Sequence, residues 1–344
     1  MRRREMLRRL SYGHIYLALL CLLAVALVAS AGVGAISYSP HRMYQLLFEA
    51  TRADTLDRNI FIQLRLPRAL LAALTGAVLG VSGTLMQGLF RNPIVEPGLV
   101  GTSAGAALGA ALVFVFGSHF AFAFAGPVMA FIGGFVATVL VYRLSTAFGK
   151  VNVLTLLLAG IAVNAVSAAG TGFLSYIARD PQARNITFWN LGTFTTADWG
   201  GAILVAIAFA GCYLWSRRYG KALNALMLGE DEAAYLGIDP RTLVVRLLIV
   251  NTLMVAVATA LVGVIAFVGL IVPHILRLIR SADYVFLIPA SALLGALFMT
   301  CVDIVARVIV RPAELPIGII TAIVGAPVFL SILLHQRGRL GAWS

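Results

Sequence analysis

The feature that most limits the fold of this chain is a series of apolar stretches, each about as long as a helix that crosses a bilayer. A transmembrane helix needs about 20 predominantly apolar residues. We therefore expect an all-α, polytopic membrane protein that forms a single domain over residues 1–344. The sequence predicts ten spans, at residues 15–36, 66–90, 98–117, 121–147, 151–176, 198–216, 243–262, 264–280, 284–308 and 316–335.

The composition agrees with a lipid environment. Apolar residues make up 60% of the 344 residues and charged residues only 12%, whereas soluble domains contain about 25% charged residues. Lys and Arg exceed Asp and Glu by 12. In a soluble protein this excess would suggest a nucleic-acid partner, but in a membrane protein basic residues accumulate on the cytoplasmic side. The composition therefore disfavours a soluble enzyme and a nucleic-acid partner.

The basic N-terminal segment 1–14 is predicted to be cytoplasmic. The first apolar stretch could instead be a signal peptide, with a cleavage site at Ala29-Ser30-Ala31. However, the stretch continues to Ile36, so we expect it to be retained as a helix. Ten spans then return the C-terminus to the cytoplasm, and 17 basic residues lie inside against nine outside. The nine outer residues are all arginines, and they can snorkel, pair locally or bind an acidic partner.

The spans contain few ionisable groups. No span contains lysine, and Asp303 is the only acid that lies fully inside one. Ion-driven carriers place several ionisable groups near the midplane, so the energy for transport is expected to enter elsewhere. The sequence has no phosphate-binding loop, no ligand-spaced histidine pair and no catalytic motif. We expect no metal site, no cofactor bound by this chain and no enzymatic activity of its own.

Two polar features interrupt the apolar runs. Residues 90–101 place polar and helix-breaking residues between the second and third spans, either as a structural turn or as a constriction that lines a pathway. The fifth span carries four polar residues spaced to share one helical face. They either pack helices together or line a translocation pathway: Asn164, Ser167, Thr171 and Ser175.

The longest cytoplasmic connection, residues 217–242, is predicted to contain a short helix. Glu230, Asp231 and Glu232 favour a helix start, and Gly237 favours its end. A short, partly apolar cytoplasmic helix in a protein without a nucleotide site suggests a socket for an external motor.

The sequence resembles the FecCD-type permeases, the membrane subunits of type II ABC importers that take up iron-siderophores, haem and cobalamin. The matching motifs follow the family order and cover most of the chain. They are Gln63–Arg68, Gly83–Gln87, Phe90–Gly98, Leu157–Gly160, Leu228–Glu230, Gly269–Arg277 and Glu314–Gly318.

The resemblance implies a homodimer in the bacterial inner membrane, with a pore at the interface and both termini in the cytoplasm. It also implies two cytoplasmic ATPase subunits, which bind ATP and Mg, and a periplasmic binding protein. The implied site residues fall in four groups. The coupling helix maps onto Leu228, Gly229, Glu230, Ala233, Leu236 and Gly237, and binding-protein docking onto Arg65, Arg68, Arg307 and Arg311. The cytoplasmic gate maps onto Asn92, Ile94, Val153 and Leu154, and the pathway onto the polar face of the fifth span.

Residues 178–192 look like the version of this segment found in haem permeases. Arg179 and Arg184 could meet the two propionates of haem, with Phe188 and Trp189 near the ring. Alternatively, a loop arginine braces the dimer or pairs with Asp180. Haem is therefore the expected transported ligand, with a ferric siderophore or cobalamin as the alternatives. A secondary carrier without an ATPase and an intramembrane enzyme are the rival classes.

Overall fold

The structure is a computed structural model that describes residues 11–34, 36–49, 55–117, 124–147, 150–151, 153–280 and 282–340. The all-α prediction is confirmed: within these residues each predicted span corresponds to a helix. Eight of the helices are long and apolar enough to cross a membrane, and two apolar helices are shorter, α6 and α14. The ten are α2 (Tyr12–Gly32), α5 (Leu66–Leu89), α6 (Thr102–Phe116), α7 (Ala125–Ser145), α8 (Val153–Ile177), α10 (Trp199–Ser216), α13 (Pro240–Val262), α14 (Val268–Ile279), α15 (Tyr284–Val308) and α16 (Ile317–Leu340).

Short elements connect the long helices. Seven of them are helical segments between spans, one is a π-helical turn that joins α4 to α5, and one is an antiparallel pair of two-residue strands. They are α3 (Pro40–Phe48), α4 (Thr55–Asn59), the π-helix η1 (Ile60–Arg65), the 3-10 helices η2 (Pro97–Val100) and η4 (Arg217–Tyr219), α9 (Asp180–Asn190), α11 (Gly220–Leu226), α12 (Glu230–Tyr235), and β1 (Thr146–Ala147) with β2 (Lys150–Val151). The second span thus begins earlier than predicted, because α4 and η1 continue into α5 without a break.

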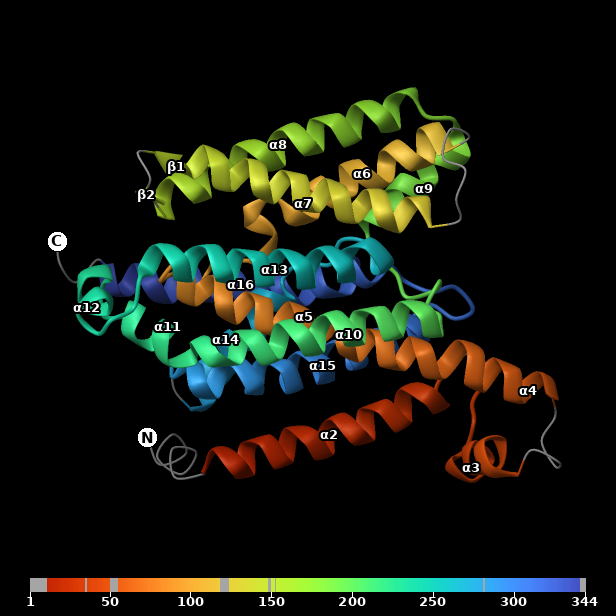
Figure 1. Cartoon of the computed structure of the whole chain (residues 1–344). Coiled ribbons are helices and arrows are strands. Elements are labelled where there is room, and N and C mark those ends of the chain that lie inside the picture. Colours follow the sequence, from red (N-terminus) through yellow and green to blue (C-terminus); the bar gives the residue numbers. More distant parts are fainter. Residues whose placement is uncertain are drawn as a thin grey trace.

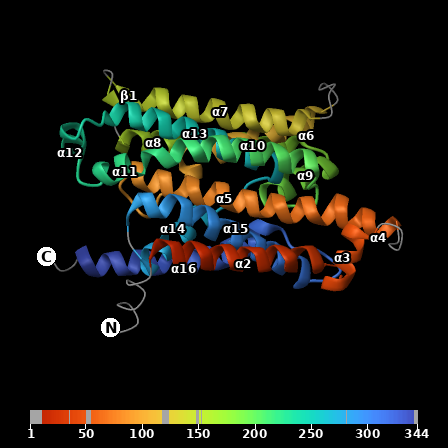
Figure 2. The ribbon, with the colours of Figure 1, turned by 60° about the horizontal axis from the view of Figure 1, so that its bottom comes forward.

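The long helices lie side by side, and α5 is at the centre (Figure 1). It packs against α10, α13, α14 and α15, and nearly all of its residues are buried. Helices α2 and α15 lie on one side of α5, whereas α7 and α8 lie on the other, as Figure 2 also shows. The start of α2, the end of α16 and α12 share one end of the molecule, and α3, α4 and α9 share the other. This arrangement agrees with an even number of crossings.

Glycines allow α5 to contact its neighbours backbone to backbone. A Cβ atom on Gly76 would lie 2.1 Å from the carbonyl oxygen of Gly295 in α15, and one on Gly83 would lie 2.0 Å from that of Gly269 in α14. Small residues allow membrane helices to approach this closely, and close packing is a main source of their association energy in lipid. The position of α14 and α15 on α5 therefore depends on these glycines.

The helices α6 and α14 are shorter than predicted because left-handed backbone precedes both of them. Gly101 has φ of 91° and ends η2, and Phe267 has φ of 69° just before α14. The two breaks meet inside the protein, where the Glu96 carboxylate accepts a hydrogen bond from the backbone N–H of Phe267. Non-helical backbone at membrane depth requires such internal partners.

Candidate functional site

The predicted cytoplasmic helix is present as α12 at one tip of the molecule (Figure 1). Ala233 is fully buried, and Glu230 forms an ion pair with Arg91 at 3.0 Å. This ion pair attaches α12 to the segment that follows α5. Three large apolar side chains beside these contacts project away from the fold: Leu228 is 70% exposed, Tyr235 91% and Leu236 65%.

The ends of α12 are defined by glycine conformations. Gly229 has φ of 149° directly before the helix, and Gly237 has φ of 79° two residues after its end. Asp239 then caps α13 by accepting hydrogen bonds from the backbone N–H groups of Arg241 and Thr242. The side-chain hydrogen bond from Thr242 is the main reason that the pKa of Asp239 lies below its usual value. The tip is therefore a folded projection, and the coupling role of its residues stays a prediction.

Two residues of the predicted polar face of α8, Asn164 and Thr171, point toward α6 and η2. Asn164 and Thr171 line a cavity of about 380 Å³ together with Gly98 and Ser103. The Asn164 side-chain amide donates to the carbonyl oxygen of Gly98 at 3.3 Å. This cavity joins two features that the sequence analysis left separate, the polar face of the fifth span and the break at residues 90–101.

The other two residues of the polar face lie differently. Ser167 is buried and faces an apolar groove between α7 and α8, and Ser175 is half-buried. The open side of α8 is apolar, with Leu158, Ile161 and Tyr176 among its exposed residues. Ser167 is thus placed as a packing residue would be, whereas the pathway role of Asn164 and Thr171 stays a prediction.

The predicted gate residues lie in two places. Asn92 accepts a hydrogen bond from the backbone N–H of Ile94 at 3.1 Å, and Ile94 packs against α14 and α16. Leu154, at the start of α8, is 65% exposed; the side chain of Val153 lies outside the described residues. A constriction that includes Leu154 would therefore need a further element, such as a second copy of the chain.

At the opposite end of the molecule, two of the predicted docking arginines, Arg68 and Arg307, belong to one buried ion network. Asp303 is fully buried, and its carboxylate lies 2.9 Å from Arg68 and 2.8 Å from Arg307. Arg68 also contacts Glu314 at 2.9 Å. Arg65 lies next to this network, where its guanidinium stacks over the ring of Tyr38 at 4.7 Å.

Arg65 and Arg307 hold the C-terminal end of α2. Arg65 donates to the carbonyl oxygens of Ala31 and Gly32 at 3.2 and 3.1 Å. Arg307 donates to those of Ser30 and Val33 at 3.0 and 2.7 Å. The last carbonyls of a helix lack partners within it, and these guanidinium groups supply them.

The sequence analysis placed all four arginines at an outer docking surface. The structure instead buries Arg65 and Arg307, which are 8% and 6% exposed, because each has several carbonyl partners within this chain. Arg68 is mostly buried against Asp303, and Arg311 is exposed. The docking role of the group stays a prediction, and Arg311 offers the most accessible guanidinium for it.

The segment that resembles haem permeases forms α9 at the same end as Arg311. Arg184 and Phe188 are both exposed and lie one helical turn apart, so they share a face. Phe188 borders a pocket of about 260 Å³ with Thr193, Thr195 and Glu314.

Arg179 precedes α9, and its backbone N–H donates to the side chain of Gln182 at 3.0 Å. In the part of the chain that the structure describes, neither Arg179 nor Arg184 forms an ion pair with Asp180. The two guanidinium groups are therefore available at this end of the molecule.

The sequence analysis did not single out Glu96 or Gln87. Glu96 links the break before α6 to the break before α14, and Gln87 donates to the carbonyl oxygen of Gly269 at 3.1 Å while accepting from Arg277. The sequence contained a signal for both residues. Each is a charged or amide side chain within an apolar stretch, and such a side chain needs a hydrogen-bond partner when it is buried. The partners themselves lie more than 170 residues away and could not be read from the pattern.

Comparison with known proteins extends these observations. A model of the FecCD transport family matches residues 22–335. The hemin transport system permease protein HmuU of Yersinia pestis is 39% identical over 93% of this chain and 95% of its own length. The vitamin B12 import system permease protein BtuC of Klebsiella pneumoniae is 40% identical over 82% of this chain and 84% of its own.

A solved structure agrees with these relatives. It is described as an inward-facing conformation of a transporter of the metal-chelate ABC type, and it is 33% identical with a TM-score of 0.83. It covers 94% of this chain and 99% of its own. The fold is thus that of a type II ABC importer permease, and the chain belongs to the FecCD transport family.

Proposed function

We propose that this chain is the membrane-spanning subunit of an ATP-driven importer and that it moves haem into the bacterial cytoplasm through a homodimeric pore. The observation that carries the first part is the tip around α12. Three large apolar side chains there, Leu228, Tyr235 and Leu236, are exposed on a folded helix that is fixed to the rest of the protein by Ala233 and the Glu230–Arg91 ion pair.

An ATPase subunit would cover this tip. Exposed apolar side chains outside the lipid mark interaction surfaces. When the ATPase moves, α12 would move with it. Because Glu230 of α12 is paired with Arg91, this movement would displace the segment that contains Arg91. This segment leads directly to Glu96 and to the cavity that Asn164 lines. Fewer than ten residues therefore separate Arg91, which contacts α12, from the proposed pathway.

The homodimer is supported by the uneven burial of α8. One side of α8 packs on α6 and α7, whereas Leu158, Ile161 and Tyr176 on its open side are more than half exposed. A second copy facing this side would enclose a pore whose wall includes α8. Leu154 of each copy would then stand at the cytoplasmic mouth, where the predicted gate requires it.

Haem is supported by the chemistry of the outer end and by one relative. Two propionates and a flat apolar ring match the guanidinium groups of Arg179 and Arg184, which form no ion pair with the residues that the structure describes, beside the exposed ring of Phe188. The relative HmuU is named for hemin transport. Because the vitamin B12 permease BtuC has a similar identity, identity alone does not select haem; a cobalamin or a ferric siderophore is the alternative ligand.

The orientation that accompanies this proposal places α12 and both termini in the cytoplasm of a bacterial inner membrane. The opposite end, with Arg311 and α9, would then face the periplasm and receive a binding protein that carries haem. ATP and Mg would bind the ATPase subunits, and no cofactor is assigned to this chain.

The test is uptake into proteoliposomes that contain this chain, its ATPase and haem-loaded binding protein. We expect uptake of haem that requires ATP and is not matched by cobalamin or a ferric siderophore. Uptake of another chelate in preference to haem would overturn the ligand while retaining the importer. Uptake by this chain alone under an ion gradient would contradict the importer and favour a secondary carrier.

A second experiment addresses the arginines. Arg179→Gln with Arg184→Gln should reduce haem uptake at least tenfold while ATPase binding to α12 is unchanged. The control is Arg42→Gln, which removes an outer arginine that pairs with Asp57 at 2.9 Å. Normal haem uptake by the double variant would refute propionate recognition by these residues.

A further inference from the structure

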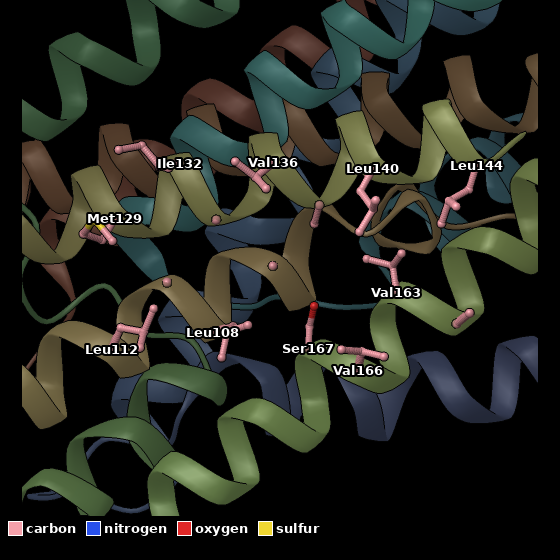
Figure 3. A pocket seen from close by; sticks show the side chains of 15 residues that line it. Leu108, Leu112, Met129, Ile132, Val136, Leu140, Leu144, Val163, Val166 and Ser167 are labelled. Atoms are coloured by element: carbon pink, nitrogen blue, oxygen red, sulfur yellow. The ribbon is translucent and has the colours of Figure 1, made fainter. Parts of the chain in front are cut away.

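An apolar groove on the described part of the chain lies outside the proposed transport pathway. It has a volume of about 490 Å³ and lies between α7 and α8, with α6 as its floor (Figure 3). Leucine, isoleucine, valine and methionine side chains line it, and Ser167 is the one polar side chain among the lining residues. The labelled residues of α7 that line it are Met129, Ile132, Val136, Leu140 and Leu144.

At the floor of the groove, α6 and α7 approach each other backbone to backbone. A Cβ atom on Gly105 would lie 2.4 Å from the carbonyl oxygen of Gly133, and one on Gly109 would lie 2.0 Å from that of Met129. These contacts fix α6 against α7. Larger side chains such as Leu108 of α6 and Val136 of α7 line the groove beside these contacts.

The groove is open to the outside of the protein. Val136 is 57% exposed, Leu140 46%, Leu144 55% and Val166 72%. From Met129 to Leu144 the groove follows α7 for about 22 Å at the rise of an α-helix, which is most of the roughly 30 Å hydrocarbon thickness of a bilayer. An extended acyl chain has this length and this chemistry.

A cation stands at one end of the groove. Arg143 lies in the last turn of α7, three residues after Leu140 and therefore on the same face, and it is exposed. Among the described residues it forms no ion pair with an acidic side chain. This end of α7 is the end of the molecule that carries α12 (Figure 1). The orientation in the proposed function would place Arg143 at the headgroups of the cytoplasmic leaflet.

We propose that this groove binds one acyl chain of an anionic phospholipid whose phosphate is held by Arg143. A basic residue at the headgroup level attracts anionic lipid, and the apolar walls exclude a polar ligand. The site is separate from the proposed haem pathway, because Asn164 and Thr171 face a different cavity. Bound lipid would contact α7 and α8 together and so fix their spacing.

The test uses photoactivatable phospholipids in nanodiscs that contain the full-length protein. Phosphatidylglycerol and phosphatidylethanolamine, each with a diazirine in the acyl chain, are crosslinked and the labelled peptides are mapped by mass spectrometry. We expect labelling to concentrate in residues 129–144 and 162–167. The preference for phosphatidylglycerol should fall about fivefold in Arg143→Gln, as expected for the loss of one interfacial cation.

Val136→Trp should fill the groove and reduce its labelling at least fivefold. Leu214→Trp is the matched control, since Leu214 on α10 is 60% exposed and lies outside the groove; it should leave the groove labelling unchanged. Thermal unfolding checks that both variants fold, and Leu140→Trp replaces Val136→Trp if the latter does not.

Two results would overturn the proposal. The first is uniform labelling of all lipid-facing helices with no effect of Val136→Trp. The second is efficient disulfide formation between two copies of a Val136→Cys variant in the nanodisc, because a second copy would then cover the groove in place of lipid. Failure of haem transport would not affect either readout.

Discussion

The guanidinium of Arg68 lies 2.9 Å from the carboxylate of Asp303, and the two residues join the start of α5 to the last third of α15. Arg307 approaches the same carboxylate at 2.8 Å and holds the end of α2 through backbone carbonyls. Three helices that lie far apart in the sequence are therefore connected through one buried acid. The neutralisation of Asp303 by two arginines explains how an acid can lie near the end of a membrane helix.

Asp303→Asn should destabilise the protein strongly, because two buried guanidinium groups would lose their counter-charge. Removal of one partner from a buried ion pair typically costs about 3–5 kcal/mol. The measurement is thermal unfolding of the purified protein in detergent. Glu314→Gln is the control: it removes the exposed partner of Arg68, for which about 0–1 kcal/mol is typical. Equal effects of the two variants would show that the buried network does not hold these helices together.

Gly83→Ala should lower stability because the new Cβ atom would lie 2.0 Å from the carbonyl oxygen of Gly269. Overpacking of this kind costs about 1–3 kcal/mol. Gly211→Ala in α10 is a matched control, since a Cβ atom there meets nothing within 4 Å, and it should be neutral or stabilising. Thermal unfolding distinguishes the two, and a neutral Gly83→Ala would contradict the close approach of α5 and α14.

Leu236→Asp should prevent the ATPase subunit from co-purifying with this chain, because a charge would replace an exposed apolar contact at the tip of α12. Leu204→Asn on α10, which is 51% exposed and outside α12, should leave co-purification unchanged. ATPase activity in the assembled complex gives a second readout. If the Leu236→Asp variant still bound the ATPase subunit and showed normal ATPase activity in the complex, the ATPase would have to bind at a surface other than α12.

Arg311→Glu and Arg65→Gln should have different effects. Arg311 is exposed, so charge reversal should weaken the docking of an acidic binding protein, and more at low salt than at high salt. Arg65 is buried and donates to the end of α2, so its replacement should mainly lower thermal stability. Binding-protein affinity measured at two salt concentrations, beside thermal unfolding, separates the roles. A salt-independent effect of Arg311→Glu would argue against electrostatic docking.

The positions of the helices were predictable because each span obeys a rule that is local in the sequence. About 20 apolar residues are needed to cross the hydrocarbon, and α7, α8, α13 and α15 follow this rule closely. The helix α12 was also predictable, since acids at its start and Gly237 after its end are local signals. The lengths of α6 and α14 could not be predicted from the sequence, because the breaks before these helices depend on long-range contacts such as the hydrogen bond between Glu96 and Phe267.

The sequence by itself determined that this chain is an all-helical membrane protein of the FecCD type, with a short helix at α12 between two spans and polar residues along α8. Only the tertiary structure decided which partners the charged and polar side chains contact. It buried Arg65 and Arg307 on the end of α2 and turned Asn164 toward the break at Gly98. The physical reason is that a charged or polar side chain in an apolar surrounding takes whichever partner the packed helices bring within hydrogen-bond distance. That partner is set by helix packing over hundreds of residues and not by local spacing.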